Sequence, residues 1–177
     1  MNSDGNAPLK LTDSPGRIRG PVWSPDGRMI AFNDESLSGS ASLAIWIVQV
    51  PSSGKEPEEP TRIVLPHISF SMLAGWTANN SIGILMANPR HQAVYTVPAG
   101  GGRATQVTPE AFSLLSPIQP RWSPDGRSLC LRLGTGGIAS IPAQGGEFKV
   151  VHDADKTKVT AGTPGGGYGT SPDGKTI

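Results

Sequence analysis

One short motif recurs along the chain and constrains its fold more than any other feature. Residues 21–28 read Pro-Val-Trp-Ser-Pro-Asp-Gly-Arg, residues 120–127 read Pro-Arg-Trp-Ser-Pro-Asp-Gly-Arg, and residues 169–174 read Gly-Thr-Ser-Pro-Asp-Gly. A degenerate copy, Gly-Trp-Thr-Ala-Asn-Asn, occupies residues 75–80. The equivalent positions Trp23, Trp76, Trp122 and Thr170 follow one another at spacings of 53, 46 and 48 residues. The chain is therefore built from repeats of nearly constant length.

Each repeat contains the same series of apolar segments. A predicted strand follows each motif (29–32, 82–86 and 129–133), a second comes after a loop (43–50, 93–97 and 138–141), and a third follows a turn rich in Gly or Pro (61–65, 104–108 and 148–151). A short strand around each Trp brings the number to four. Blades of β-propellers repeat at about 40–50 residues with four strands each. We therefore expect an all-β fold, a β-propeller of four-stranded blades, with Trp23, Trp76 and Trp122 packing between blades.

The repeats divide the chain into about three blades and parts of a fourth. We assign residues 1–12 to the outer strand that ends a preceding blade, 13–66 to blade 1, 67–112 to blade 2, 113–160 to blade 3, and 161–177 to the first strands of a further blade. Rings of six to eight blades need about 280 to 380 residues at this spacing. The chain is thus expected to be a fragment of a larger ring; a ring completed by a second copy and a closed four-bladed monomer are the alternatives.

The Ser-Pro-Asp-Gly segment has the chemistry of a hairpin turn. Pro sets φ at the first central position, Asp suits the second, Gly supplies a left-handed conformation, and the Ser hydroxyl can bond to the turn amides. In the degenerate copy, Asn79 takes the Asp place and Asn80 the Gly place, where Asn is the best substitute at positive φ. We assign structural roles, not catalytic or metal-binding ones, to Ser24, Pro25, Asp26, Gly27, Asn79, Asn80, Ser123, Pro124, Asp125, Gly126, Ser171, Pro172, Asp173 and Gly174.

Composition narrows the function classes. The chain has 15 basic and 14 acidic residues, a net charge of +1, and hence no basic footprint for nucleic acid. The single cysteine, Cys130, lies in an apolar run and is expected to be a small buried side chain. We expect no membrane insertion, because no apolar run has the length of a membrane span. The first residues also lack the basic and apolar segments of a signal peptide.

The sequence predicts no catalytic residue, no metal ligand and no cofactor. No Gly-x-Ser-x-Gly nucleophile motif occurs. His67, His91 and His152 lie in different repeats, in or beside predicted loops, without metal-ligand spacing to one another. Residues 134–139, Gly-Thr-Gly-Gly-Ile-Ala, match a dinucleotide-binding pattern, but that pattern must open a helix and the residues that follow favour a strand.

The motif resembles the WD40-like "PD40" repeat of the TolB-type propeller and of the propeller domains of prolyl-oligopeptidase and dipeptidyl-peptidase enzymes and the tricorn protease. The resemblance covers nearly all of the chain. The resemblance implies a periplasmic or other extracytoplasmic compartment of a bacterium. Because the repeats contain no group of catalytic residues, we expect a non-catalytic TolB-like propeller segment that serves as a scaffold for binding a protein or peptide. Propellers carry variable loops on a rigid scaffold; those expected to contact the partner are residues 33–42, 66–71, 87–91, 109–117 and 153–166.

Two other functions remain open at this stage. The first is an accessory propeller that filters substrates for a serine peptidase whose hydrolase domain lies outside this chain. The second is a sensory propeller attached to a bacterial kinase or transcriptional regulator. A Gly-x-Ser-x-Gly motif beyond residue 177 would distinguish the first from the others.

Overall fold

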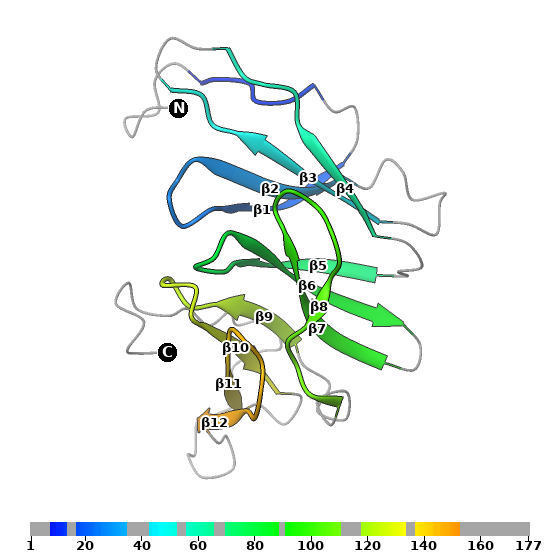
Figure 1. The fold of residues 1–177 in the computed structure, drawn as a ribbon, viewed down its shortest axis with the longest axis vertical. Helices are drawn as coiled ribbons and strands as arrows, with labels where there is room; N and C mark the ends of the chain where they lie inside the picture. Colours follow the sequence, from blue (N-terminus) through cyan, green and yellow to red (C-terminus); the bar gives the residue numbers. More distant parts are fainter. Residues whose placement is uncertain are drawn as a thin grey trace, which may run out of the picture.

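The computed structural model of the chain describes residues 8–13, 17–34, 43–52, 56–65, 70–88, 91–110, 118–133 and 137–152. Within these ranges the chain forms three four-stranded antiparallel sheets (Figure 1). In each sheet every strand pairs with the next one along the sequence. The all-β fold class and the prediction of four strands per repeat are confirmed.

The three sheets follow the three predicted repeats. Sheet 1 contains β1 (Ile18–Trp23), β2 (Met29–Asp34), β3 (Leu43–Gln49) and β4 (Thr61–Leu65). Sheet 2 contains β5 (Phe70–Trp76), β6 (Ser81–Asn88), β7 (His91–Pro98) and β8 (Thr105–Gln106). Sheet 3 contains β9 (Ile118–Trp122), β10 (Ser128–Arg132), β11 (Ile138–Pro142) and β12 (Lys149–His152).

The sheets stack face to face in sequence order, as Figure 1 shows. The first strands of the repeats contact one another, β1 against β5 and β5 against β9. Apolar side chains fill the space on both sides of sheet 2. Because successive side chains of a strand point to opposite faces, Ile84 packs in the cluster shared with sheet 1 and Leu85 in the cluster shared with sheet 3. Burial of these two apolar layers is what holds the sheets together.

The last strand of the second repeat is shorter than the sequence predicts, with β8 ending at Gln106. Beyond it, the hydroxyl of Thr108 takes over a bond of the ladder: the Val94 N–H donates to Thr108 Oγ1 at 3.0 Å. The Val107 N–H still donates to the Val94 carbonyl at 2.8 Å. The chain thus stays beside β7 while its backbone leaves regular strand pairing.

The outer strand expected within residues 1–12 is not formed in its described part. Residues 8–13 have no strand structure, although Lys10 and Asp13 form an ion pair. The strands with which such a segment would pair belong to a preceding blade, and the described residues contain none. The further blade expected at 161–177, with Ser171, Pro172, Asp173 and Gly174, lies outside the described residues.

Candidate functional site

The two Ser-Pro-Asp-Gly turns that the structure describes have the same internal pattern of hydrogen bonds. In the first, the Ser24 hydroxyl donates to Asp26 Oδ1 at 2.6 Å, and the backbone N–H of Arg28 donates to the same oxygen at 3.1 Å. The Met29 N–H in turn donates to Ser24 Oγ at 2.9 Å. These bonds join the two ends of the turn, so the carboxylate is engaged within its own hairpin.

The second complete turn repeats the network almost atom for atom. The Ser123 hydroxyl donates to Asp125 Oδ1 at 2.5 Å, the Arg127 N–H donates to that oxygen at 3.0 Å, and the Ser128 N–H donates to Ser123 Oγ at 3.0 Å. In both turns the hydrogen bond from the serine, followed by that from the backbone N–H, lowers the pKa of the Asp carboxyl below its usual value. Each carboxylate is therefore hydrogen-bonded within its own hairpin turn.

The degenerate turn uses different residues for the same bonds. The Thr77 hydroxyl donates to Asn79 Oδ1, and the Ser81 N–H donates to Thr77 Oγ1 at 3.0 Å. An amide oxygen therefore stands where the other two turns have a carboxylate oxygen, and this turn carries no charge at that place.

The residue in the glycine place is left-handed in all three turns. The φ angle is 68° at Gly27, 66° at Gly126 and 61° at Asn80. The positive φ expected of Asn80 is confirmed.

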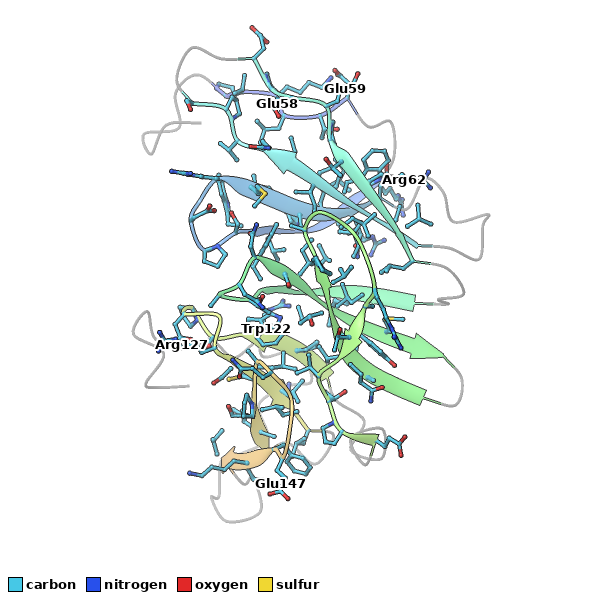
Figure 2. All side chains as sticks on the ribbon, viewed as in Figure 1. Glu58, Glu59, Arg62, Trp122, Arg127 and Glu147 are labelled. Atoms are coloured by element: carbon cyan, nitrogen blue, oxygen red, sulfur yellow. The ribbon has the colours of Figure 1, made fainter. Side chains whose placement is uncertain are left out.

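The tryptophans of the motif differ in what they contact. Trp76 is buried against sheet 1, and its indole N–H donates to the Val22 carbonyl oxygen at 3.0 Å. Figure 2 shows Trp122 between sheets 2 and 3. Its buried ring packs over Gly83, and its Nε1 has no hydrogen-bond partner among the described residues. Trp23 departs from the predicted packing with 59% of its surface exposed, because the described residues contain no sheet on its side.

The described histidines and the cysteine lie on different strands. His91 begins β7 and His152 ends β12, whereas His67 lies outside the described residues. Cys130 is buried in β10 as expected, and burial raises the pKa of its thiol. Across the described ranges no three His, Cys, Asp or Glu residues form a group that could hold a metal ion. The same ranges include no helix with the length and apolarity of a membrane span.

The dinucleotide-like segment fails its structural test in the described part. Residues 134–136 lie outside it, but Ile138–Pro142 form strand β11 where that motif requires a helix.

The loops expected to contact a partner connect strand ends at one edge of the stack. They follow β2, β4, β6, β8 and β12, and because antiparallel strands alternate in direction, these strand ends lie opposite the β1–β2, β5–β6 and β9–β10 turns. Most of the loop residues themselves lie outside the described part of the chain. The partner-binding face therefore stays a prediction.

At the edge that carries the turns, sheets 2 and 3 border a partly open hollow of about 340 Å³ with a mixed polar and apolar lining, here called the inter-sheet cavity. The β5–β6, β7–β8, β9–β10 and β11–β12 turn regions all contribute to it. A wider groove of about 740 Å³ lies further out, lined by Glu110, Glu147 and Phe148 among others. Neither was predicted, since each is formed by residues from two different repeats.

Comparison with known proteins supports the fold. No family model matches the chain. The uncharacterized protein Atu1656 of Agrobacterium fabrum is 41% identical over 56 residues, which are 32% of this chain and 18% of that protein. Among solved structures, puromycin hydrolase aligns with 80% of the chain at a TM-score of 0.57 and 16% identity. A structure from a study of two prolyl endopeptidases aligns with 77% at a TM-score of 0.55 and 14% identity.

The two structural matches show that the three sheets have the fold of part of a β-propeller such as those of these peptidases. The chain spans less than a quarter of each of these proteins: 18% of the Agrobacterium protein, 23% of puromycin hydrolase and 22% of the endopeptidase.

Proposed function

We propose that this chain is a segment of the accessory β-propeller of a larger serine peptidase of the prolyl-oligopeptidase type. The observation that carries the proposal is the likeness of its three stacked sheets to puromycin hydrolase and a prolyl endopeptidase, of which it spans only 22–23%. We attribute the repeats to the PD40 type on the strength of the two Trp-Ser-Pro-Asp-Gly copies.

In this role the segment performs no chemistry of its own. The turn carboxylates Asp26 and Asp125 are engaged by their own hairpins, and Cys130 is a buried thiol whose pKa is raised, which disfavours the nucleophilic thiolate. The catalytic serine is proposed to lie outside these 177 residues.

The segment contributes a rigid stack of sheets that carries loops along one edge. Two buried apolar layers fix the sheets relative to one another. The strand ends that carry the predicted loops, those of β2, β4, β6, β8 and β12, are therefore held in defined positions. Loops on such a scaffold can select peptides by size and shape before they reach a catalytic domain. The same loops would serve a free-standing protein-binding scaffold, but the likeness to peptidases favours substrate filtering.

The test uses the product of the complete gene and a fluorophosphonate probe, which labels the nucleophile of serine hydrolases. We expect labelling of the complete protein and none of the 177-residue chain, which is the control. Shortening the loop at residues 35–42 should then change the rate ratio between long and short proline-containing peptides, with the labelling intact. Absence of labelling in the complete protein would refute the peptidase role, and an unchanged ratio would refute filtering by this segment.

A further inference from the structure

The inter-sheet cavity has the size and the lining of a site for a small polar ligand. Its volume of about 340 Å³ is at the lower end of the range for small-molecule pockets, roughly 300–1,000 Å³. Thr96 on β7 and Thr105 on β8 are cross-strand partners, and both line the cavity. Two hydroxyl groups therefore lie side by side on one side of the cavity. The cavity is thus supplied with neutral hydrogen-bonding groups.

The charges of the lining all have one sign. Arg103 from the β7–β8 connection and Arg127 from the β9–β10 turn line the cavity, and no described Asp, Glu or His does. Arg103 has no ion pair or side-chain hydrogen bond with any described residue. Arg127, which Figure 2 labels at the edge of sheet 3, is close to the Asp125 carboxylate, but that group already accepts two hydrogen bonds within its turn.

The degenerate repeat removes the negative charge that this wall would otherwise have. Asn79 lines the cavity at the place where the other two turns have Asp26 and Asp125. Its amide oxygen accepts the Thr77 hydroxyl as a carboxylate oxygen would. The turn is therefore kept, while a carboxylate that would oppose anion binding is absent from this turn alone among the three described.

Backbone contacts between the sheets set the shape of the cavity in advance. The Ala78 N–H donates to the Gly126 carbonyl at 3.2 Å, and a Cβ on Gly126 would lie 2.2 Å from Ala78 N. Further out, a Cβ on Gly145 would lie 3.1 Å from the Val107 carbonyl oxygen. Two turns of sheet 3 are thus fixed against sheet 2 on its cavity side, which lowers the ordering cost of binding a ligand.

We propose that the inter-sheet cavity binds a small organic anion, whose carboxylate or phosphate group is held by Arg103 and Arg127. Guanidinium groups bind these oxyanions through paired N–H donors, and the flanking hydroxyls suit a ligand that also carries polar substituents. The proposal does not depend on the peptidase role, because it rests on residues of this chain alone.

The experiment measures binding of two probes, inorganic phosphate and citrate, to the full 177-residue chain by isothermal titration calorimetry, with glycerol as a neutral control. The two anions distinguish a phosphate ligand from a carboxylate ligand. Three variants test the cavity, Arg103→Gln, Arg127→Gln and Asn79→Asp. Arg28→Gln is the matched control. Arg28 follows Gly27 as Arg127 follows Gly126, but Arg28 does not line the cavity.

We expect saturable binding of at least one anion, weakened about tenfold or more in each cavity variant and unchanged in Arg28→Gln, with melting temperatures near that of the wild type. Asn79→Asp is the most discriminating of the three variants, because Asp occupies the same position in the other two described turns without disturbing them. Absence of saturable binding by either anion, or an equal loss in Arg28→Gln, would overturn the proposal. Peptidase activity does not enter this measurement, so either proposal can fail without the other.

Discussion

The indole N–H of Trp76 donates to the carbonyl oxygen of Val22 at 3.0 Å, joining two sheets through residues 54 positions apart. One repeat later, Trp122 has the same place in its motif, yet its buried Nε1 has no partner. The repeat thus places the same side chain in two environments that differ by one hydrogen bond. Comparing the two tryptophans therefore measures what this one hydrogen bond contributes to the packing between sheets.

Phe substitutions should separate the two tryptophans. Trp76→Phe loses the hydrogen bond and leaves the Val22 carbonyl without it, whereas Trp122→Phe removes a buried donor that was already unpaired. We expect Trp76→Phe to lower the free energy of unfolding by about 1–3 kcal/mol more than Trp122→Phe. Urea unfolding measures both, and each variant controls for the lost ring volume of the other. Equal costs would contradict the assignment.

The local parts of this fold could be predicted from sequence because their signals are local. The apolar segments after each motif indicated the number of strands per repeat, and the turn chemistry indicated the positive φ of Asn80. Both depend on residues within a few positions of one another. Strand ends were less well predicted where a side chain replaces the ladder, as Thr108 does beside β7.

The contacts between sheets could not be predicted in the same way. That Trp23 is exposed while Trp76 and Trp122 are buried depends on which sheets stack, not on the motif that all three share. The inter-sheet cavity likewise joins residues of two repeats, such as Arg103 and Arg127. The one signal available in the sequence was Asn79 in the Asp place, and there it was interpreted as a turn substitution only.

A methyl group at Gly83 should disrupt the packing of Trp122. A Cβ there would lie 1.8 Å from Trp122 Nε1 and 2.7 Å from Cε2, closer than atoms approach, so the ring must move. We expect Gly83→Ala to cost about 1–3 kcal/mol of unfolding free energy, as overpacking usually does. Gly100→Ala, where a Cβ would meet nothing within 4 Å, is the matched control.

A double variant tests the cause of that loss. Because Phe lacks the indole ring atoms nearest to the added methyl, Gly83→Ala combined with Trp122→Phe should cost less than the two single variants together. Additive costs would mean that the methyl group does not act through Trp122.

Acid should weaken the fold partly through the turn carboxylates. The hydrogen bond from Ser123, and then that from the Arg127 N–H, lowers the pKa of Asp125 in the folded chain. A lowered folded pKa stabilises the fold above the unfolded pKa, about 4 for Asp, and this contribution is lost as the pH falls through the folded pKa.

Asp125→Asn should therefore melt slightly below the wild type at pH 7 and converge with it as the pH falls through the lowered pKa of the folded Asp125 carboxyl. The effect is small because the carboxylate is exposed to solvent. Melting temperatures from pH 2.5 to 7 measure it. A difference between the two proteins that stays constant over this range would show that the charge of Asp125 makes no contribution.

Alanine substitutions at the two described Ser-Pro-Asp-Gly glycines distinguish the cost of a left-handed backbone from the cost of a clash between sheets. Gly27 and Gly126 have nearly the same φ, 68° and 66°, so an added Cβ meets the same local strain at both, about 1–2 kcal/mol. At Gly27 it would meet nothing within 4 Å, but at Gly126 it would lie 2.2 Å from Ala78 N and 2.7 Å from the Thr77 carbonyl carbon.

Those atoms are backbone and cannot turn aside, so the β9–β10 turn must withdraw from sheet 2. We expect Gly126→Ala to cost about 1–3 kcal/mol more than Gly27→Ala in urea unfolding. The same withdrawal breaks the hydrogen bond from Ala78 to Gly126, so amide exchange at Ala78 should accelerate in Gly126→Ala and stay unchanged in Gly27→Ala. Equal stabilities together with a protected Ala78 amide would show that the two turns are not held together as the structure has them.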